Sequence, residues 1–271
     1  MRQKCETAPT ARLEARFQVA GGKTQMARCF ASAPLKIAKT FALSEDAGDG
    51  IGVCVMDCSP GLLAGDFYRF GWHLEENSRV LVTTQGFTRV HPSRDNPCRL
   101  EQKIRLERGA VLEWFPEPLM LFEGANLRSE CDVEMAAGAT LLLGEIVCAG
   151  RVARGEAFAF HALQSRLRVR RDGRLIFLNH SALRPALFDP ARVGAWGDFT
   201  HQGTFTVFSP RVNDVLREKL RALLEESKRV WGGISLLDEG GLVVSILGHR
   251  AFDLKEIMAR LRAAIRRFLA E

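Results

Sequence analysis

The chain has 271 residues, of which 46% are hydrophobic and 26% charged, a composition typical of a globular protein and not of a disordered one. The net charge of +6 is a mild excess that permits an acidic partner without requiring nucleic acid. The N-terminus lacks the apolar core of a secretory signal, and no stretch approaches the ~18 apolar residues of a membrane helix. We therefore expect a cytoplasmic protein.

The first 208 residues are predicted to form mainly short strands. Between Leu13 and Val19 apolar and charged or polar residues alternate with period two, which is typical of a half-buried strand. Similar short runs, separated by turns that often contain glycine, occur at 52–56, 80–84, 111–115, 131–135, 140–146, 166–171 and 204–208.

A weak internal repeat runs through the middle of this region. Taking Ser78, Gly109 and Gly138 as equivalent turn positions gives steps of 31 and 29 residues. A step of this size predicts stacked strand layers, as in a solenoid or β-helix. The three windows that share the order strand, tight turn and more apolar strand are HLEENSRVLVT, IRLERGAVLEW and DVEMAAGATLLLG.

The pattern becomes helical after residue 208. Ser209–Pro210 resembles a helix start with proline at the first helical position, and Trp231–Gly233 is predicted to end that helix. Asp253 with Glu256 resembles the capping box of a last helix. Each helix carries an apolar stripe at helical spacing.

The expected fold is mainly β, with a β-helix-like or solenoid-like body followed by an α+β part. A hairpin is predicted across residues 234–247, between the two helices. The body is assigned to residues 1–208, and the helix–hairpin–helix part to residues 209–271. No low-complexity linker separates them, so we expect the two parts to pack together.

Signatures of common catalytic and metal sites are missing. The segment GGKT at 21–24 resembles the end of a phosphate loop, but Phe17 occupies the position of the required first glycine. The seven cysteines form no C-x-x-C pair, and their odd number favours reduced thiols over a disulfide framework. Cys54 and Cys58 are the only close pair, and no second pair follows to complete a zinc site.

Nucleic-acid binding is disfavoured as well. The two basic runs, at 166–171 and 260–267, are not interleaved with the aromatic residues on which bases stack. The first run alternates with apolar residues, which is typical of the solvated face of a strand.

Two glutamates lie on predicted apolar strand faces. Glu113 and Glu145 each share a face with apolar neighbours, where a charge is costly unless it is paired or binds a cation. Pairing with arginine is the simpler interpretation, for example between Glu145 and Arg151 or Arg154.

Three further acids, Asp66, Glu117 and Glu123, lie beside predicted turns. Together the five carboxylates suggest a route for a divalent cation, since oxygen ligands bind such ions less tightly than thiolate or imidazole sets and so suit transit. No tightly bound cofactor is expected.

Six blocks of the chain resemble, in the same order and with similar spacing, those of the urease accessory proteins UreD/UreH. The resemblance extends over most of residues 12–252. The blocks are PLKIAKTF (34–41), SPGLLAGD (59–66), VLVTTQGFTRV (80–90), GAVLEWFPEPLMLFEGA (109–125), GEIVCAGRVARGEAF (144–158) and GLVVSILGHRA (241–251).

The resemblance implies a non-enzymatic scaffold with a β-helix-like body and two helices. It implies binding to the urease apoprotein and to UreF-like and UreG-like partners, with UreG as the GTPase that brings nickel. It also implies nickel in transit through an internal tunnel. Glu145 and Asp66 fall in family-like blocks and are the first candidates to line it, followed by Glu113, Glu117 and Glu123.

Two other functions remain open from the sequence. A β-solenoid carbohydrate hydrolase would need two acids ~5–10 Å apart in an open groove, and Glu113 beside Trp114 is the best candidate for one of them. A metal-independent protein-interaction module would differ from the urease scaffold only in its partners. The segment Pro116–Pro118 departs from the family-like pattern by moving the acid, which puts the role of Glu117 in doubt.

Overall fold

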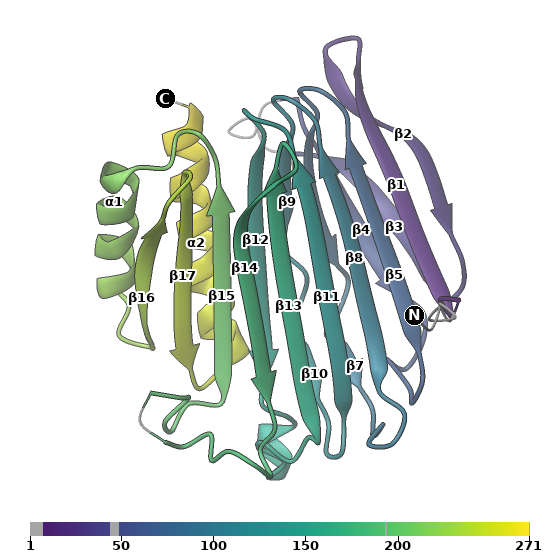
Figure 1. The fold of residues 1–271 in the computed structure, drawn as a ribbon, viewed down its shortest axis with the longest axis vertical. Helices are drawn as coiled ribbons and strands as arrows, with labels where there is room; N and C mark the ends of the chain where they lie inside the picture. The colour runs from purple at the N-terminus through teal and green to yellow at the C-terminus, as the bar shows by residue number, and fades with distance from the viewer. Residues whose placement is uncertain (1–7, 44–48, 193, 271) are drawn as a thin grey trace.

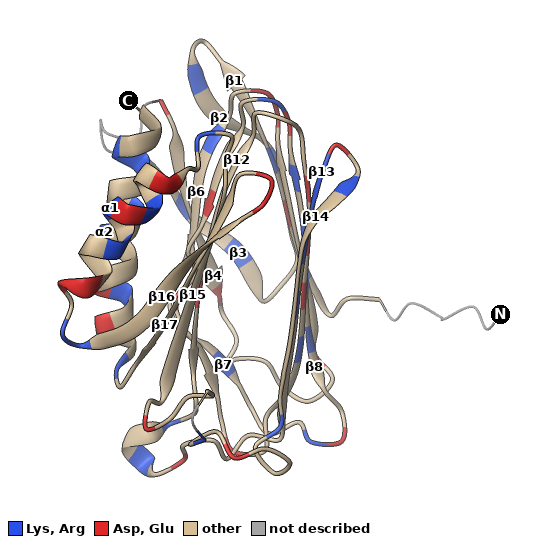
Figure 2. Cartoon of the chain, turned by 60° about the vertical axis from the view of Figure 1, so that its left-hand side comes forward, with Lys and Arg blue, Asp and Glu red and all other residues tan. Residues whose placement is uncertain are grey.

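The structure, a computed structural model, describes residues 8–43, 49–192 and 194–270. Two β-sheets lie face to face, and two α-helices cover the outer side of one of them (Figure 1). Figure 2 shows these three layers nearly edge-on, with several charged positions marked along both helices.

One sheet, here called sheet A, has seven strands. Its five central strands run parallel to one another, and an antiparallel strand closes each edge. In spatial order the strands are β14 (Arg174–Leu183), β13 (Ala162–Arg171), β11 (Asn126–Met135), β8 (Cys98–Leu106), β5 (Phe67–Leu74), β1 (Ala11–Ala20) and β2 (Lys23–Ala31).

The other sheet, sheet B, has ten strands. Four strands of its main path are parallel, the short strands β7 and β10 also make parallel pairs, and antiparallel strands extend the sheet on both sides. Its main path is β16 (Val230–Leu237), β17 (Gly241–Gly248), β15 (His201–Phe208), β12 (Thr140–Cys148), β9 (Val111–Trp114), β6 (Arg79–Thr84), β4 (Ile51–Asp57) and β3 (Leu35–Ala42). The short strand β10 (Leu119–Leu121) pairs with β12, and β7 (Thr88–Val90) pairs with β10.

The chain alternates between the sheets in stacked coils, which confirms the predicted solenoid-like body. Arg79 pairs with Val111, 32 residues later, and Val111 pairs with Thr140, 29 residues later. The turn position equivalent to Gly109 and Gly138 is Asn77, because all three have positive φ at the same point of the turn. The choice of Ser78 as the equivalent residue was therefore wrong by one position. Asparagine tolerates this left-handed conformation better than most residues.

The main core lies between the two sheets. In β1 the side chains of Leu13, Ala15 and Phe17 are buried and contribute to it, as the alternating pattern predicts. Polar residues between them face outward. A second core lies on the other side of sheet B, where apolar residues of β12, β15 and β17 meet the helices. Both faces of this part of sheet B are therefore covered.

The helices are α1 (Asp214–Glu225) and α2 (Ala251–Ala270), and a short 3-10 helix spans Val152–Arg154. The predicted start of the first helix at Ser209–Pro210 was wrong, because the Asn213 side chain caps the helix by accepting a hydrogen bond from the Leu216 amide. None of the described helices is both long and apolar enough to cross a membrane.

Two other predicted helix boundaries were also wrong. The Trp231–Gly233 segment does not end a helix but belongs to β16, which pairs with β17 as the predicted hairpin. Asp253 is not the cap of the last helix, since it lies inside the first turn of α2 and its carboxylate binds Arg250 and Arg229.

Candidate functional site

A cavity of about 490 Å³ lies between the two sheets. It adjoins an interruption of sheet B. There β6 ends at Thr84 and β7 begins at Thr88, while β9 ends at Trp114 and β10 begins at Leu119. Residues of both links line the cavity, namely Gln85, Gly86 and Phe87 in one and Pro116 and Glu117 in the other. Prolines 116 and 118 in one link cannot donate backbone hydrogen bonds to a ladder, which helps to keep the sheet open.

Glu145 lies on β12 beside this interruption. β12 pairs with β9 as far as Leu143 and with β10 from Val147 onward, so the segment around Glu145 has no strand partner on that side. Leu141, Leu143 and Val147 point into the core between the sheets, and strand alternation directs the Glu145 side chain the same way. It is the one exposed position in a run of buried residues along β12, because it borders the cavity.

The Glu145 carboxylate has no cationic partner. No described residue makes a hydrogen bond or ion pair with it, and burial between the sheets raises its pKa. The predicted pairing with Arg151 does not form, since that guanidinium holds Glu156 at 2.5 and 2.7 Å. No ion pair links Arg154 to Glu145 either. The carboxylate faces the space of the cavity without a protein partner, so the site favours a water molecule or a cation at this oxygen.

Other polar groups line the same cavity and were not singled out from the sequence. The Gln102 side-chain nitrogen is buried without a hydrogen-bond partner among the described residues. The Tyr68 hydroxyl bonds Ser59 at 3.3 Å, and burial raises the pKa of Tyr68 to about 12. Gln102 occupies an inward position between Leu100 and Ile104 in a strand, and this break in the apolar alternation could have indicated it.

Glu113 points in the opposite direction, toward α2. Its side chain is 7% exposed and makes ion pairs with Arg266 at 2.7 Å and with Arg262 at 3.8 Å. Burial lowers the pKa of Arg262. The carboxylate is thus held by two guanidinium groups beneath a helix. The hydrolase hypothesis requires an acid that is open to a polysaccharide, and Glu113 is not open in this way.

The remaining three predicted acids occupy different places. Glu117 lines the cavity beside the interruption of sheet B, and its two oxygens each accept a hydrogen bond from Lys255 of α2 at 2.6 Å. Asp66 accepts a hydrogen bond from the Leu63 amide at 2.8 Å and thereby closes a turn. Glu123 is exposed in the loop after β10. Of the five predicted acids, the cavity brings together Glu145 and Glu117.

A ready-made metal centre is not found in the described part of the chain. Within it, no group of three or more His, Cys, Asp or Glu side chains is arranged to hold an ion. Cys54 is partly buried on β4, whereas Cys58 is exposed beyond its end, and no further ligand joins them among these residues. The cavity therefore offers isolated oxygen ligands, which suit brief contacts with a cation better than storage.

These features define a class of protein: a β-helical scaffold with an acid-bearing internal cavity. Comparison with known proteins identifies the family, because the family model for the UreD urease accessory protein matches residues 9–271. The chain belongs to the UreD family, whose description is that of an accessory protein and not of an enzyme.

Individual relatives agree with this assignment. A urease accessory protein UreD from Actinobacillus pleuropneumoniae serotype 3 (strain JL03) is 33% identical over 245 residues, covering 89% of this chain and 91% of that protein. The protein of the same name from Acetivibrio thermocellus is 32% identical over 251 residues, covering 93% and 95%. One from Haemophilus influenzae (strain 86-028NP) is 29% identical over 250 residues, covering 89% and 92%.

Proposed function

We propose that this protein is a non-catalytic scaffold for urease maturation in the cytoplasm, and that it assists nickel insertion into the urease apoprotein. Family membership along nearly the whole chain supports the maturation role. Nucleotide chemistry would belong to a UreG-like GTPase partner, since the segment at 21–24 lacks the glycine of a phosphate loop. A UreF-like protein would join the same complex.

The observation that carries the nickel proposal is the unpaired Glu145 carboxylate inside the cavity, beside the gap in sheet B. A divalent cation entering this space would neutralise the carboxylate that faces the cavity. Because few protein ligands are grouped there, the ion would be bound weakly and could move on. Glu117 would take part only when its ion pair with Lys255 opens.

Deletion of the gene in a urease-producing strain tests the maturation role. The urease subunits are expected to accumulate without nickel and without activity, and the intact gene should restore both. Normal urease activity in the deletion strain at limiting nickel would contradict the proposal. Co-purification of the chain with UreF-like and UreG-like proteins and urease subunits tests the partners separately.

A further inference from the structure

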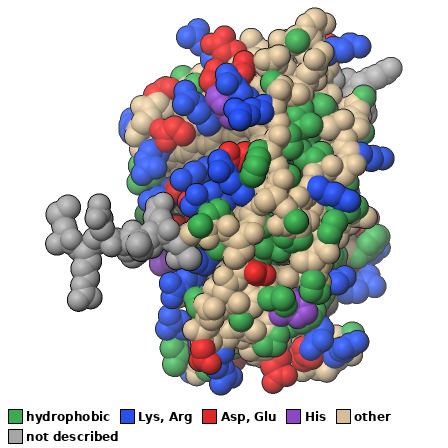
Figure 3. All heavy atoms as spheres, turned by 90° about the vertical axis from the view of Figure 1, so that its right-hand side faces the viewer, with side chains coloured by type: hydrophobic (Ala, Val, Ile, Leu, Met, Phe, Trp, Pro, Cys, Tyr) green, Lys and Arg blue, Asp and Glu red, His purple; other side chains and the backbone are tan. Residues whose placement is uncertain are grey.

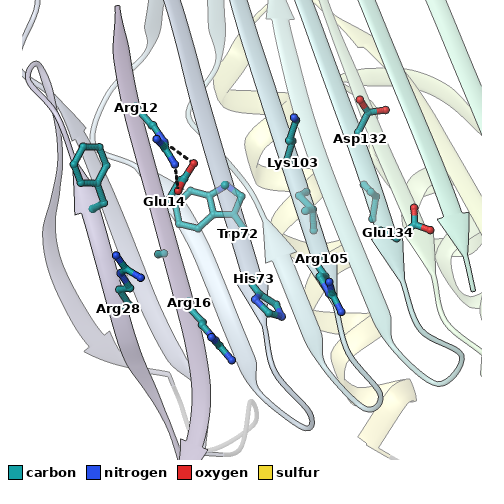
Figure 4. Close-up of a pocket in the computed structure, with 15 residues that line it drawn as sticks. Arg12, Glu14, Arg16, Arg28, Trp72, His73, Lys103, Arg105, Asp132 and Glu134 are labelled. Carbon is teal, nitrogen blue, oxygen red and sulfur yellow. Dashed lines mark hydrogen bonds and ion pairs between the residues drawn. The ribbon is translucent and has the colours of Figure 1, made fainter. Parts of the chain in front are cut away.

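The outer face of sheet A carries a second hollow, on the opposite side of this sheet from the interior cavity. It measures about 720 Å³ and lies over β1, β5 and β8, on the side of the molecule opposite the helices (Figures 1 and 4). Gly71 on β5 has no side chain to fill the space between its neighbours, and a Cβ there would lie 3.0 Å from the Glu14 side chain. We refer to this feature as the Gly71 hollow.

Several basic side chains around the Gly71 hollow are weakly neutralised. Arg28 has no ion pair with any described residue and is exposed. The ammonium of Lys103 is 3.5 Å from a Glu101 oxygen, and the Arg105 guanidinium is 3.9 Å from Glu107. Each of these glutamates also has a closer basic partner. The three cations therefore keep most of their charge available to solvent.

Two of the three acids that line the hollow already form ion pairs with arginines of this chain. The Glu14 carboxylate accepts two hydrogen bonds of 2.5 Å from Arg12, and Asp132 forms a bidentate pair with Arg168. Figure 4 shows Arg12, Arg16 and Arg28 of β1 and β2 on one side of β5, and Lys103 and Arg105 of β8, followed by the acids of β11, on the other side. Figure 3, viewed from the side of β1 and β2, shows Lys and Arg side chains crowded along the margin where sheet A lies.

We propose that the Gly71 hollow docks an extended acidic segment of a partner protein. Exposed ion pairs contribute little to folding stability, so the concentration of charge here is better explained by recognition. Phe30 is 50% exposed at the edge of the hollow and offers an apolar contact to such a segment.

The pattern of charge selects a protein partner over a nucleic acid. β11 presents an acidic row to the same face, formed by Glu130, Asp132 and Glu134. Glu130 and Asp132 are paired with Arg166 and Arg168, but Glu134 is exposed and has no ion pair with a described residue, so a uniform polyanion that crosses the sheet would meet an acid that is not neutralised. A polypeptide can place acids over Arg28, Lys103 and Arg105 and neutral or basic residues over β11. This inference does not depend on the role in urease maturation.

Fluorescence anisotropy with purified full-length protein provides the test. The probes are a labelled peptide of alternating glutamate and serine, the same peptide with glutamine, and oligo-dT of equal length. The acidic peptide is expected to bind at low salt and the glutamine peptide at least about tenfold more weakly. The triple variant Arg28→Glu/Lys103→Glu/Arg105→Glu should lose at least about tenfold in affinity for the acidic peptide.

The matched control variant is Lys36→Glu/Lys39→Glu/Lys228→Glu, which makes the same change in net charge at exposed positions outside the Gly71 hollow. It should lower affinity for the acidic peptide less than about twofold. An equal loss in both variants would show attraction to net charge alone and overturn the proposal. So would tighter binding of oligo-dT than of the peptide, or no binding of the acidic peptide by the wild type. Circular dichroism would confirm that both variants are folded.

Discussion

The buried ion pairs between Glu113 and α2 allow a quantitative prediction. Glu113→Gln removes the negative charge that holds Arg266 at 2.7 Å and Arg262 at 3.8 Å, while both guanidinium groups remain mostly covered. Removing one partner of a buried pair costs about 3–5 kcal/mol, because the other charge is left without compensation. At ~2–4 °C per kcal/mol for a chain of this size class, the melting temperature should fall by roughly 6–20 °C.

Urea unfolding monitored by circular dichroism measures this free energy. The control is Glu123→Gln, which changes an exposed acid and should alter stability by less than about 0.5 kcal/mol. A double-mutant cycle with Arg266→Met should recover part of the loss, since that substitution removes the stranded cation. A loss below about 1 kcal/mol in Glu113→Gln would refute the assignment of Glu113 as an anchor for α2.

Three further predictions concern stability. Glu145→Gln should stabilise the protein near pH 8. Burial raises the pKa of the Glu145 carboxyl in the folded state, so the folded protein loses stability as pH rises above the pKa of about 4.3 that this carboxyl has in the unfolded chain. The gain should disappear near pH 4 in urea titrations, and an equal gain at both pH values would contradict the reasoning. Gly150→Ala should lower the melting temperature more than Gly155→Ala. Both glycines have positive φ, but only at Gly150 would a Cβ meet a backbone oxygen, that of Glu156 at 1.9 Å. Equal losses in the two variants would refute this reasoning. Leu261→Ala should cost about 2–5 kcal/mol in urea unfolding, since this fully buried side chain joins α2 to sheet B, and a change under about 1 kcal/mol would contradict that packing.

Most strands and their inward faces could be predicted from period-two alternation, because each central strand of sheet A has one face in the core and one in solvent. The turn at Asn77 was misjudged because its left-handed residue is asparagine and not glycine. The helix boundaries were wrong for a related reason. Pro210 and Gly232 are strong local signals, but strand pairing and the Asn213 cap decide where the helices begin and end.

The candidate site was only partly predictable. Alternation indicated that Glu113 and Glu145 share faces with apolar residues, and both do. It could not show which face borders a cavity, since sheet A covers one side of sheet B and the helices cover the other. The cavity itself arises where two neighbouring coils interrupt sheet B together, which is a property of their stacking.

The proposed nickel route depends most on Glu145. The variant Glu145→Gln separates a role of this residue in the cavity from a role in folding. Glu145→Gln keeps the shape of the side chain and removes the charge that would meet the cation. Glu123→Gln is the matched control, since it changes an exposed acid that does not line the cavity.

The most direct measurement is the nickel content of urease purified after co-expression with this chain and its partners, comparing the wild type, Glu145→Gln and Glu123→Gln. The account predicts that all three assemble with the urease subunits, and that nickel content and activity fall only with Glu145→Gln. Full nickel content with Glu145→Gln would contradict the proposed route, and loss of the complex in that variant would make Glu145 a structural residue instead.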